Sequence, residues 1–265
     1  MQEGEERMIY AMSDIHGNYE LMEERITQLR PLLANTDDRL LLLGDFIDRG
    51  NKSYQCLQMA YDFEKEFGSD KIINIKGNHE LWFEQFLFEG NEFWLELDGD
   101  FFTSGTFLAK DEYHELNCKP DREQRISYMK DCIMNNHKDL INWMKGLRLF
   151  YETESQIFVH AGVDENVSES ELCLADMSKE VLTGKFPPSK GYFFKDIIAG
   201  HVSASFVAGK RNHKGIYYDG ASHFYIDGSM ARNGRLLCLA YDEQRKEYYE
   251  LMEDGSYKSI EKHIV

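Results

Sequence analysis

Short apolar runs alternate with amphipathic segments through the first third of the chain. Strands are predicted for the apolar runs Met8–Met12, Leu40–Leu43 and Ile72–Ile75. The segments Tyr19–Leu33 and Tyr54–Phe67, which lie between these runs, have the apolar spacing of helices. Strands that alternate with helices in this way are typical of βαβ units, so we expect a largely parallel core.

The pattern changes after about residue 80. Residues 81–150 are first rich in aromatic side chains and then have helical spacing with mixed charge. We therefore expect a helical insertion, or cap, within a single domain of residues 1–265. Glycine-containing turns separate the last of the later strand patterns, which predicts antiparallel pairing there. These patterns lie at Gln156–Val159, Asp196–Ala199, Gly215–Tyr218, His223–Ile226 and Leu236–Tyr241.

Composition and charge narrow the classes of function. With 265 residues, 42% of them hydrophobic, the chain can bury a substantial core. Its net charge of −17 disfavours nucleic acid as a partner, because a broad basic face is lacking. No apolar run approaches the roughly 20 residues of a membrane span, and Met1–Arg7 lacks the pattern of a secretory signal. We expect a cytoplasmic protein with no membrane partner, in which an anionic substrate needs a local positive site.

Polar clusters follow five of the apolar runs directly. The carboxyl ends of the strands of an open α/β sheet form its binding crevice, so we expect the five clusters to converge. Carboxylate, imidazole and amide oxygen are suitable ligands for Mn²⁺, Fe or Zn²⁺. The clusters are Ser13–Asn18, Gly44–Gly50, Lys76–Glu80, His160–Gly162 and Gly200–His201.

These clusters differ in how specific they are. Asp14-x-His16 and Gly200-His201 are short patterns that also occur as turn or capping residues beside a hydrogen-bonded histidine. The pattern GDxxDRG is more specific, because a seven-residue turn rarely collects two acids, an arginine and two glycines after an apolar strand. GNHE after the next strand is similarly specific. The ordered set of five therefore favours a functional site over five separate structural roles.

The order DxHG, GDxxDRG, GNHE, HAG, GH resembles that of the calcineurin-like metallophosphoesterases, over roughly Met8–Tyr241. The DRG element makes the chain most similar to the serine/threonine phosphoprotein phosphatase branch and its bacterial and phage relatives. That branch also includes symmetrical diadenosine tetraphosphate hydrolase. The resemblance implies an α/β (α+β) fold of four layers, with a central β-sandwich flanked by helices and carrying the helical insertion.

The resemblance also implies two divalent metal ions. Asp45 would bridge them, and two cations on one carboxylate can hold and acidify a water between them. Manganese is our first expectation, with iron or zinc as alternatives. The implied ligands are Asp14, His16 and Asp45 for the first ion, and Asp45, Asn78, His160 and His201 for the second.

Four further residues receive roles from the resemblance. His79 would be the general acid, oriented by Asp48, although it could instead be another metal ligand. Arg49 matches a phosphate-binding arginine, and its alternative is a salt bridge to a nearby acid. Relatives usually carry a second such arginine between HAG and GH, where this chain has none. Lys179 lies roughly there, but an ammonium group does not replace a bidentate guanidinium.

Two groups of residues stay open. The aromatic cluster Leu81–Phe88, with Phe93, Trp94, Phe101 and Phe102, is either the core of the cap or a substrate platform. The histidines outside the motifs are expected to be exposed or structural. They are His114, His137, His213, His223 and His263.

The function expected from the resemblance is hydrolysis of phosphate monoesters on a phosphorylated protein or a small molecule. Hydrolysis of diadenosine tetraphosphate is the alternative, because it uses the same metal ligands. Cyclic-nucleotide diesterase relatives share the ligands but typically lack the DRG element. A non-catalytic binding scaffold would be expected to have lost ligands, and none of the six is missing.

Overall fold

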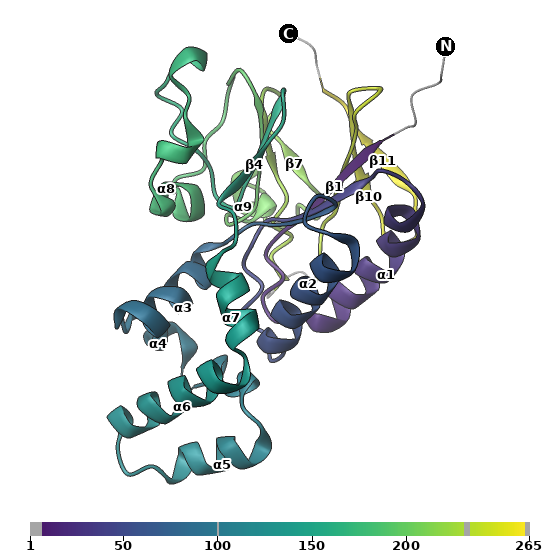
Figure 1. Cartoon of the computed structure of the whole chain (residues 1–265). Coiled ribbons are helices and arrows are strands. Elements are labelled where there is room, and N and C mark those ends of the chain that lie inside the picture. The colour runs from purple at the N-terminus through teal and green to yellow at the C-terminus, as the bar shows by residue number, and fades with distance from the viewer. Residues whose placement is uncertain (1–6, 100, 231–233, 263–265) are drawn as a thin grey trace.

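Two β-sheets form the centre of the protein (Figure 1). The computed structural model describes residues 7–99, 101–230 and 234–262. The first sheet has the order β11-β10-β9-β1-β2-β3 and the second β4-β5-β6-β8-β7. The first contains β1 (Met8–Met12), β2 (Arg39–Leu42), β3 (Ile72–Asn74), β9 (Leu239–Asp242), β10 (Glu247–Leu251) and β11 (Tyr257–Ile260). The second contains β4 (Phe150–Glu152), β5 (Gln156–Val159), β6 (Asp196–Ala199), β7 (Tyr217–Tyr218) and β8 (His223–Tyr225).

The parallel core predicted for the first third of the chain is confirmed. Strands β1, β2 and β3 pair in parallel, and α1 (Tyr19–Asn35) and α2 (Ser53–Phe67) connect them. Among the later strands, β7 and β8 pair antiparallel as expected, but β8 pairs in parallel with β6. Strand β9 also pairs antiparallel, but its partners are β1 and β10 of the first sheet and not β8. A local pattern does not reveal which of two sheets a strand joins.

Successive residues of β1 point to opposite faces of the first sheet. Ile9 and Ala11 belong to the core between the sheets, together with Phe158 and Ile198 of the second sheet. Tyr10 belongs to the core under α1 and α2. On its outer face the second sheet packs against the short helices α8 (Lys179–Gly184) and α9 (Ala204–Val207) and the loops around them. The order helices, sheet, sheet, helices confirms the four-layer sandwich.

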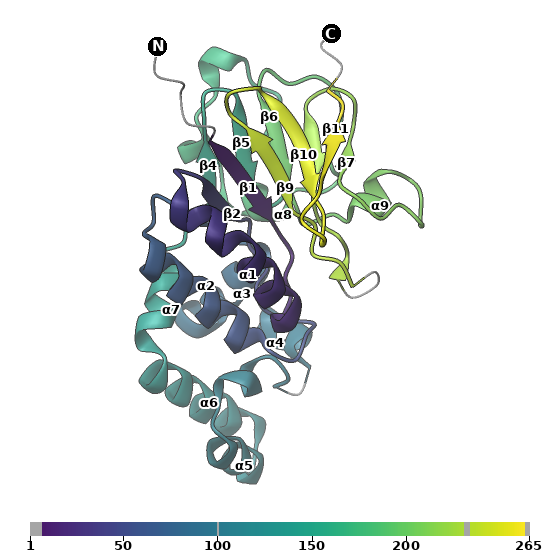
Figure 2. The same cartoon turned by 90° about the vertical axis from the view of Figure 1, so that its right-hand side faces the viewer.

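The helical region between the two sheets continues the layer of α1 and α2. Ile133 and Ile141 of this region lie in the same core as Leu57 of α2. Helices α5 and α6 lie at the end of the molecule opposite the two termini (Figure 2). Whether residues 1–265 form a single domain stays a prediction. The helices are α3 (Asn78–Glu89), α4 (Phe93–Asp98), α5 (Lys110–Cys118), α6 (Arg122–Asn136) and α7 (Lys138–Lys145), with 3-10 turns at Ser104–Phe107, Glu169–Glu171 and Leu174–Asp176.

None of the helices in the described ranges has the length and apolar character that crossing a bilayer requires.

Candidate metal centre

Hydrogen bonds join the loops that follow the strands. The backbone N–H of His16 donates to the carbonyl of Asp45 at 2.8 Å, and that of His201 donates to Asp14 Oδ2 at 2.9 Å. The loops approach so closely that a Cβ on Gly77 would lie 2.2 Å from Asp45 Oδ1, so glycine is required there. The loops after strands of both sheets therefore meet at one place.

The carboxylate of Asp45 lies at the centre of this meeting point. Its Oδ2 is 3.4 Å from His16 Nε2, 3.4 Å from His160 Nε2 and 3.8 Å from His79 Nε2. Two groups of potential ligands share this residue: one is His16, Asp45 and His79, and the other is Asp45, His160 and His201. Such sharing is the arrangement that a bridging carboxylate requires.

Asn78 adds a neutral oxygen to the second group. Its Oδ1 lies 3.0 Å from His160 Nε2 and 2.9 Å from His201 Nδ1. Asn78 is the first residue of α3, directly after β3, so the helix start fixes its position. The structure thus brings four of the predicted ligands, Asp45 included, together on this side.

The donor atoms are oriented as cation ligands. His16 Nδ1 bonds to the carbonyl of Ile47 at 2.9 Å, and His160 Nδ1 bonds to that of Leu43 at 2.6 Å. Each bond occupies Nδ1, so Nε2 is the nitrogen that faces the site and that would offer its lone pair to a cation once it has lost its proton. In addition, Asp14 Oδ1 and His16 Nε2 are buried without a hydrogen-bond partner and lie 3.8 Å apart. Buried polar atoms rarely lack partners, so a pair of divalent cations fits these residues.

The pKa values of the site residues also indicate that this place favours positive charge. Burial alone would raise the pKa of Asp45, but His160 and His79 outweigh it and hold that pKa well below its usual range. Burial lowers the pKa of His160, yet the charge of Asp45 raises it to about 10. Burial and the neighbouring His160 lower the pKa of His201 to about 4. Protons thus balance the carboxylates when no cation is bound, and cation binding would release them.

The backbone of the site is strained. Among the described residues, nine other than glycine have positive φ, and six of these are predicted site residues. Left-handed backbone costs free energy for side chains with a Cβ, and it persists where the surrounding structure enforces it. The six are Asp14, His16, Asp45, Asp48, Arg49 and His201, with φ between 47° and 71°.

His79 lies beside this centre and is held from its other side. Its Nδ1 is 2.5 Å from Asp48 Oδ2, and the same oxygen accepts the indole N–H of Trp94 at 3.0 Å. Burial lowers the pKa of His79, but Asp45 and the bond to Asp48 outweigh it and raise that pKa above its ordinary value. The arrangement suits an acid that carries a proton on Nε2, and it leaves the role of a further ligand open as well.

The two candidate phosphate-binding residues differ in position. Arg49 is exposed, and within the described ranges its side chain has neither an ion pair nor a hydrogen bond, so the alternative of a salt bridge is not seen. Its charge acts on the pKa of His16 and of His79, so it lies near the centre. Lys179 is exposed on α8, which is tied to the loop after His160 by the bond from Ala161 N to Leu182 O. No described interaction links Lys179 to the other candidates, and its role stays a prediction.

Sequence reasoning gave no role to Glu80, which organises two of the loops. Its buried carboxylate accepts the backbone N–H groups of Asp45, Phe46, Ile47 and Gly77, at 2.8 to 3.2 Å. Burial, with the charge of Asp45, raises the pKa of Glu80 to about 7. Its position in the GNHE motif was the signal from which a role for Glu80 could have been predicted.

Asp227 is a second residue that sequence reasoning missed. It is 5% exposed, and burial, with the charge of Asp14, raises its pKa to about 8. It directly follows the apolar run His223–Ile226, so it repeats the pattern of a polar residue at a strand end. The same signal that found the other clusters could have found this one.

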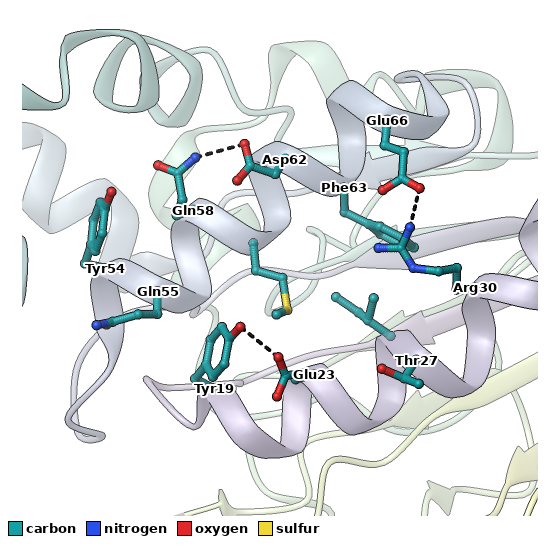
Figure 3. Close-up of a pocket in the computed structure, with 12 residues that line it drawn as sticks. Tyr19, Glu23, Thr27, Arg30, Tyr54, Gln55, Gln58, Asp62, Phe63 and Glu66 are labelled. Atoms are coloured by element: carbon teal, nitrogen blue, oxygen red, sulfur yellow. Dashed lines mark hydrogen bonds and ion pairs between the residues drawn. The ribbon is translucent and has the colours of Figure 1, made fainter.

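A separate cavity of about 420 Å³ lies between α1 and α2 (Figure 3). It contains none of the predicted site residues. Several of its polar side chains are paired with one another, as in the hydrogen bond from Tyr19 to Glu23 and the ion pair of Arg30 with Glu66. The candidate metal ligands are therefore gathered around Asp45 and not in this cavity.

Comparison with known proteins gives two kinds of curated relative. Serine/threonine-protein phosphatase 2 of Escherichia coli K12 is 34% identical over 97 residues, which cover 36% of this chain and 40% of that protein. A symmetrical bis(5'-nucleosyl)-tetraphosphatase of Nitrosospira multiformis is 27% identical over 177 residues, covering 66% of this chain and 51% of that protein. The matches thus span about half or less of these relatives.

A solved structure supports the fold over nearly the whole chain. The cold-active protein-tyrosine phosphatase of a psychrophilic Shewanella species superposes with a TM-score of 0.60 and 15% identity, covering 96% of this chain and 80% of that one. The family model of the calcineurin-like phosphoesterases matches residues 8–232. The sandwich, the converging loops and this match together show that the chain belongs to the calcineurin-like phosphoesterase family.

Proposed function

We propose that this chain hydrolyses phosphate monoesters with two divalent metal ions, in the manner of a serine/threonine protein phosphatase. The observation that supports this proposal most strongly is that two groups of potential metal ligands share Asp45. Unpartnered donor atoms of Asp14 and His16 lie beside it. The six proposed metal ligands are Asp14, His16, Asp45, Asn78, His160 and His201.

The two cations would polarise the phosphate and acidify a water, which is the chemistry that paired divalent ions supply. The side chains of the protein do the remaining work. The exposed guanidinium of Arg49 binds phosphate oxygens, and its planar fork can hold two of them at once. His79 keeps a proton on Nε2 and donates it to the leaving oxygen, while Asp48 fixes the ring through Nδ1. Lys179 is assigned a secondary role in phosphate binding.

Hydrolysis of diadenosine tetraphosphate is the second candidate. The observation that favours it is the extent of similarity, because the bis(5'-nucleosyl)-tetraphosphatase match covers 66% of the chain, against 36% for the phosphatase match. The same metal ligands would serve either reaction. A non-catalytic scaffold is disfavoured, since all six proposed ligands are retained.

Manganese is the proposed metal. Iron and zinc are the alternatives, because oxygen and imidazole ligands discriminate little among the three metals. A phosphorylated protein or a small phosphate ester is the proposed partner. The cytoplasmic location stays a prediction.

The test compares the hydrolysis of three substrates side by side. Release of inorganic phosphate is measured for the two monoesters, and formation of ADP is measured for diadenosine tetraphosphate, because its symmetrical cleavage frees no phosphate. The protein is loaded in turn with Mn²⁺, Fe²⁺ and Zn²⁺, and then given a phosphoserine peptide, diadenosine tetraphosphate and phenyl phosphate. Release above that of an Asp45→Asn control is expected for at least one monoester. Formation of ADP from diadenosine tetraphosphate alone would select the second candidate, and no hydrolysis in any combination of metal and substrate would refute both.

A further inference from the structure

We propose that Trp82 and Phe93 form a binding surface for an aromatic leaving group, so that the site prefers aryl phosphate monoesters to alkyl ones. We call this pair the aromatic ledge. The inference rests on the proposed function and adds to it the class of substrate.

A row of rings leads from the metal centre to the surface. The ring centroid of His79 lies 4.8 Å from that of His16 and 5.1 Å from that of Trp82. Trp82 in turn contacts Phe93 edge to face at 5.2 Å. The exposed fraction rises along this row from 2% at His16 to 46% at Phe93. The ledge therefore begins at the proposed acid and ends in solvent.

The position of the ledge follows from helix geometry. His79 and Trp82 are three residues apart near the start of α3, so they lie on one face of the helix. Phe93 begins α4 and packs against Trp82 from the next helix. Trp82 is only partly buried against the core. Its remaining surface is available to a ligand.

The other aromatic side chains of this region have a different role. Phe83, Phe86, Trp94 and Phe107 are almost fully buried and pack into one core. The aromatic cluster thus divides: Phe83, Phe86 and Trp94 belong to the core of the helical region, Phe88 and Phe102 are exposed, and the ledge is the partly exposed pair that leads outward from His79. Exposed rings that gather next to a reactive centre indicate binding, whereas single exposed rings need no explanation.

Because His79 and Trp82 are in contact, the ledge can bind only the part of the leaving group that is next to the ester oxygen. In an aryl ester the ring is bonded directly to the oxygen that His79 would protonate, so the ring lies beside Trp82. In a phosphoserine ester a small alkyl group takes this place and leaves the ledge uncovered. In a nucleotide the ribose separates the base from this oxygen, so the ribose and not an aromatic ring takes the place beside Trp82. Stacking and edge-to-face contacts then favour the aryl ester.

Two sources share this chemistry, phosphotyrosine in a protein and a small aryl phosphate. The experiment measures kcat/KM of the manganese-loaded protein for phenyl phosphate, a phosphotyrosine peptide and the same peptide with phosphoserine. Trp82→Ala and Phe93→Ala are expected to reduce kcat/KM for both aryl substrates by about threefold to tenfold, chiefly through KM. The value for phosphoserine should change less than about twofold. A larger effect on the peptide than on phenyl phosphate would identify the protein as the source.

Phe88→Ala is the matched control. Phe88 is an exposed ring on the same helix, but it lies against Lys145 of α7 and not beside His79. Trp82→Leu keeps apolar bulk in case the alanine variant fails to fold, and Phe93→Ala changes a residue that is already exposed.

A binding measurement gives a readout without turnover. Calorimetry with phenylphosphonate and methylphosphonate should show tighter binding of the aryl compound to the unsubstituted protein, and the difference should shrink in Trp82→Leu and Phe93→Ala. An aryl-to-alkyl ratio that these variants leave unchanged, in kinetics and in binding, overturns the ledge while the phosphatase proposal stands. Absence of hydrolysis of every ester by the unsubstituted protein counts instead against the proposed function.

Discussion

Asp45 and His79 illustrate how neighbouring side chains receive different tasks. The Oδ2 of Asp45 faces three imidazole nitrogens, as a bridging ligand does. His79 faces Asp45 from a greater distance than His16 or His160 and is bound through Nδ1 to Asp48. The geometry is consistent with the proposed roles of Asp45 as a metal ligand and of His79 as the acid.

We predict that His79→Asn slows phosphate release by about 10² or more and leaves both metals bound, because it removes the acid but no proposed ligand. Turnover and metal content by elemental analysis are measured on the same sample. Loss of metal together with unchanged turnover per bound metal would contradict the assignment of His79 as the acid.

Asp45→Asn, unlike His79→Asn, should lose the metal ions. An amide lacks the charge with which a carboxylate bridges two cations, so we expect the variant to retain little metal after dialysis and to be inactive. Asp111→Asn, on the exposed side of α5, is the control and should bind metal normally. Full metal content in Asp45→Asn would rule out the bridging role.

At the scale of elements, short polar contacts hold long loops in place. Glu80, in the first turn of α3, binds backbone N–H groups of the loop after β2. On the other sheet, His223 of β8 binds Asp219 at 3.0 Å and Glu165 at 3.2 Å, and Lys185 also pairs with Glu165. The expectation that His223 is structural is confirmed. Of the other histidines without a motif, His263 lies outside the described residues.

We predict that Glu80→Gln lowers the free energy of unfolding by about 1–3 kcal/mol, because an amide cannot accept all the N–H groups that the carboxylate accepts. Urea unfolding of the metal-free protein measures this change. Glu89→Gln, on the exposed end of the same helix, is the control. Equal stability of the two variants would contradict the role of Glu80.

The contacts of His223 predict a dependence of stability on pH. Burial lowers the pKa of His223, but its bonds to Asp219 and Glu165 outweigh it and raise that pKa to about 9. A raised histidine pKa stabilises the fold fully below the unfolded value of about 6.5, and the contribution is lost as the pH rises through about 9. The stability advantage over His223→Asn should therefore shrink by about 3 kcal/mol between about pH 6 and about pH 9.5.

Urea unfolding of the unsubstituted protein and of His223→Asn across this pH range measures the difference in their free energies of unfolding. The contributions of the other titrating groups cancel in this difference. His114→Asn, at an exposed site on α5, is the control variant. A constant difference for His223→Asn would show that the ion pairs contribute nothing.

At the scale of the whole molecule, the site lies where the two sheets meet. Asp14, Asp45 and Asn78 follow strands of the first sheet, whereas His160 and His201 follow strands of the second. A pair of cations bound there would join the two sheets as well as serve the reaction.

We therefore predict that Mn²⁺ at about one hundred times its Kd stabilises the fold by about 2.7 kcal/mol. For a chain of this size the increase in Tm should be roughly 5–10 °C. Thermal unfolding is followed with Mn²⁺ and with a chelator, and Asp45→Asn is measured in parallel. An equal increase in Asp45→Asn would place the stabilising metal elsewhere.

Much of the fold could be predicted because its signals are local. The strands β1, β2 and β3 and the helices between them appeared as alternating apolar patterns, nearly at their observed bounds. The strands β4, β10 and β11 were missed, since their partly exposed residues give a weak apolar pattern. The division of β8 and β9 between two sheets was missed because both are short buried runs.

The sequence by itself determined the candidate metal ligands, because a polar cluster after an apolar strand is a property of adjacent residues. Tertiary structure decided how these residues meet: the bond from His201 to Asp14 joins positions 187 residues apart. It also decided that Glu80 fixes a loop, that Trp94 binds Asp48, and that Trp82 stays partly exposed while Trp94 is buried. Burial and contact depend on what the rest of the chain brings alongside, and no local pattern contains that information.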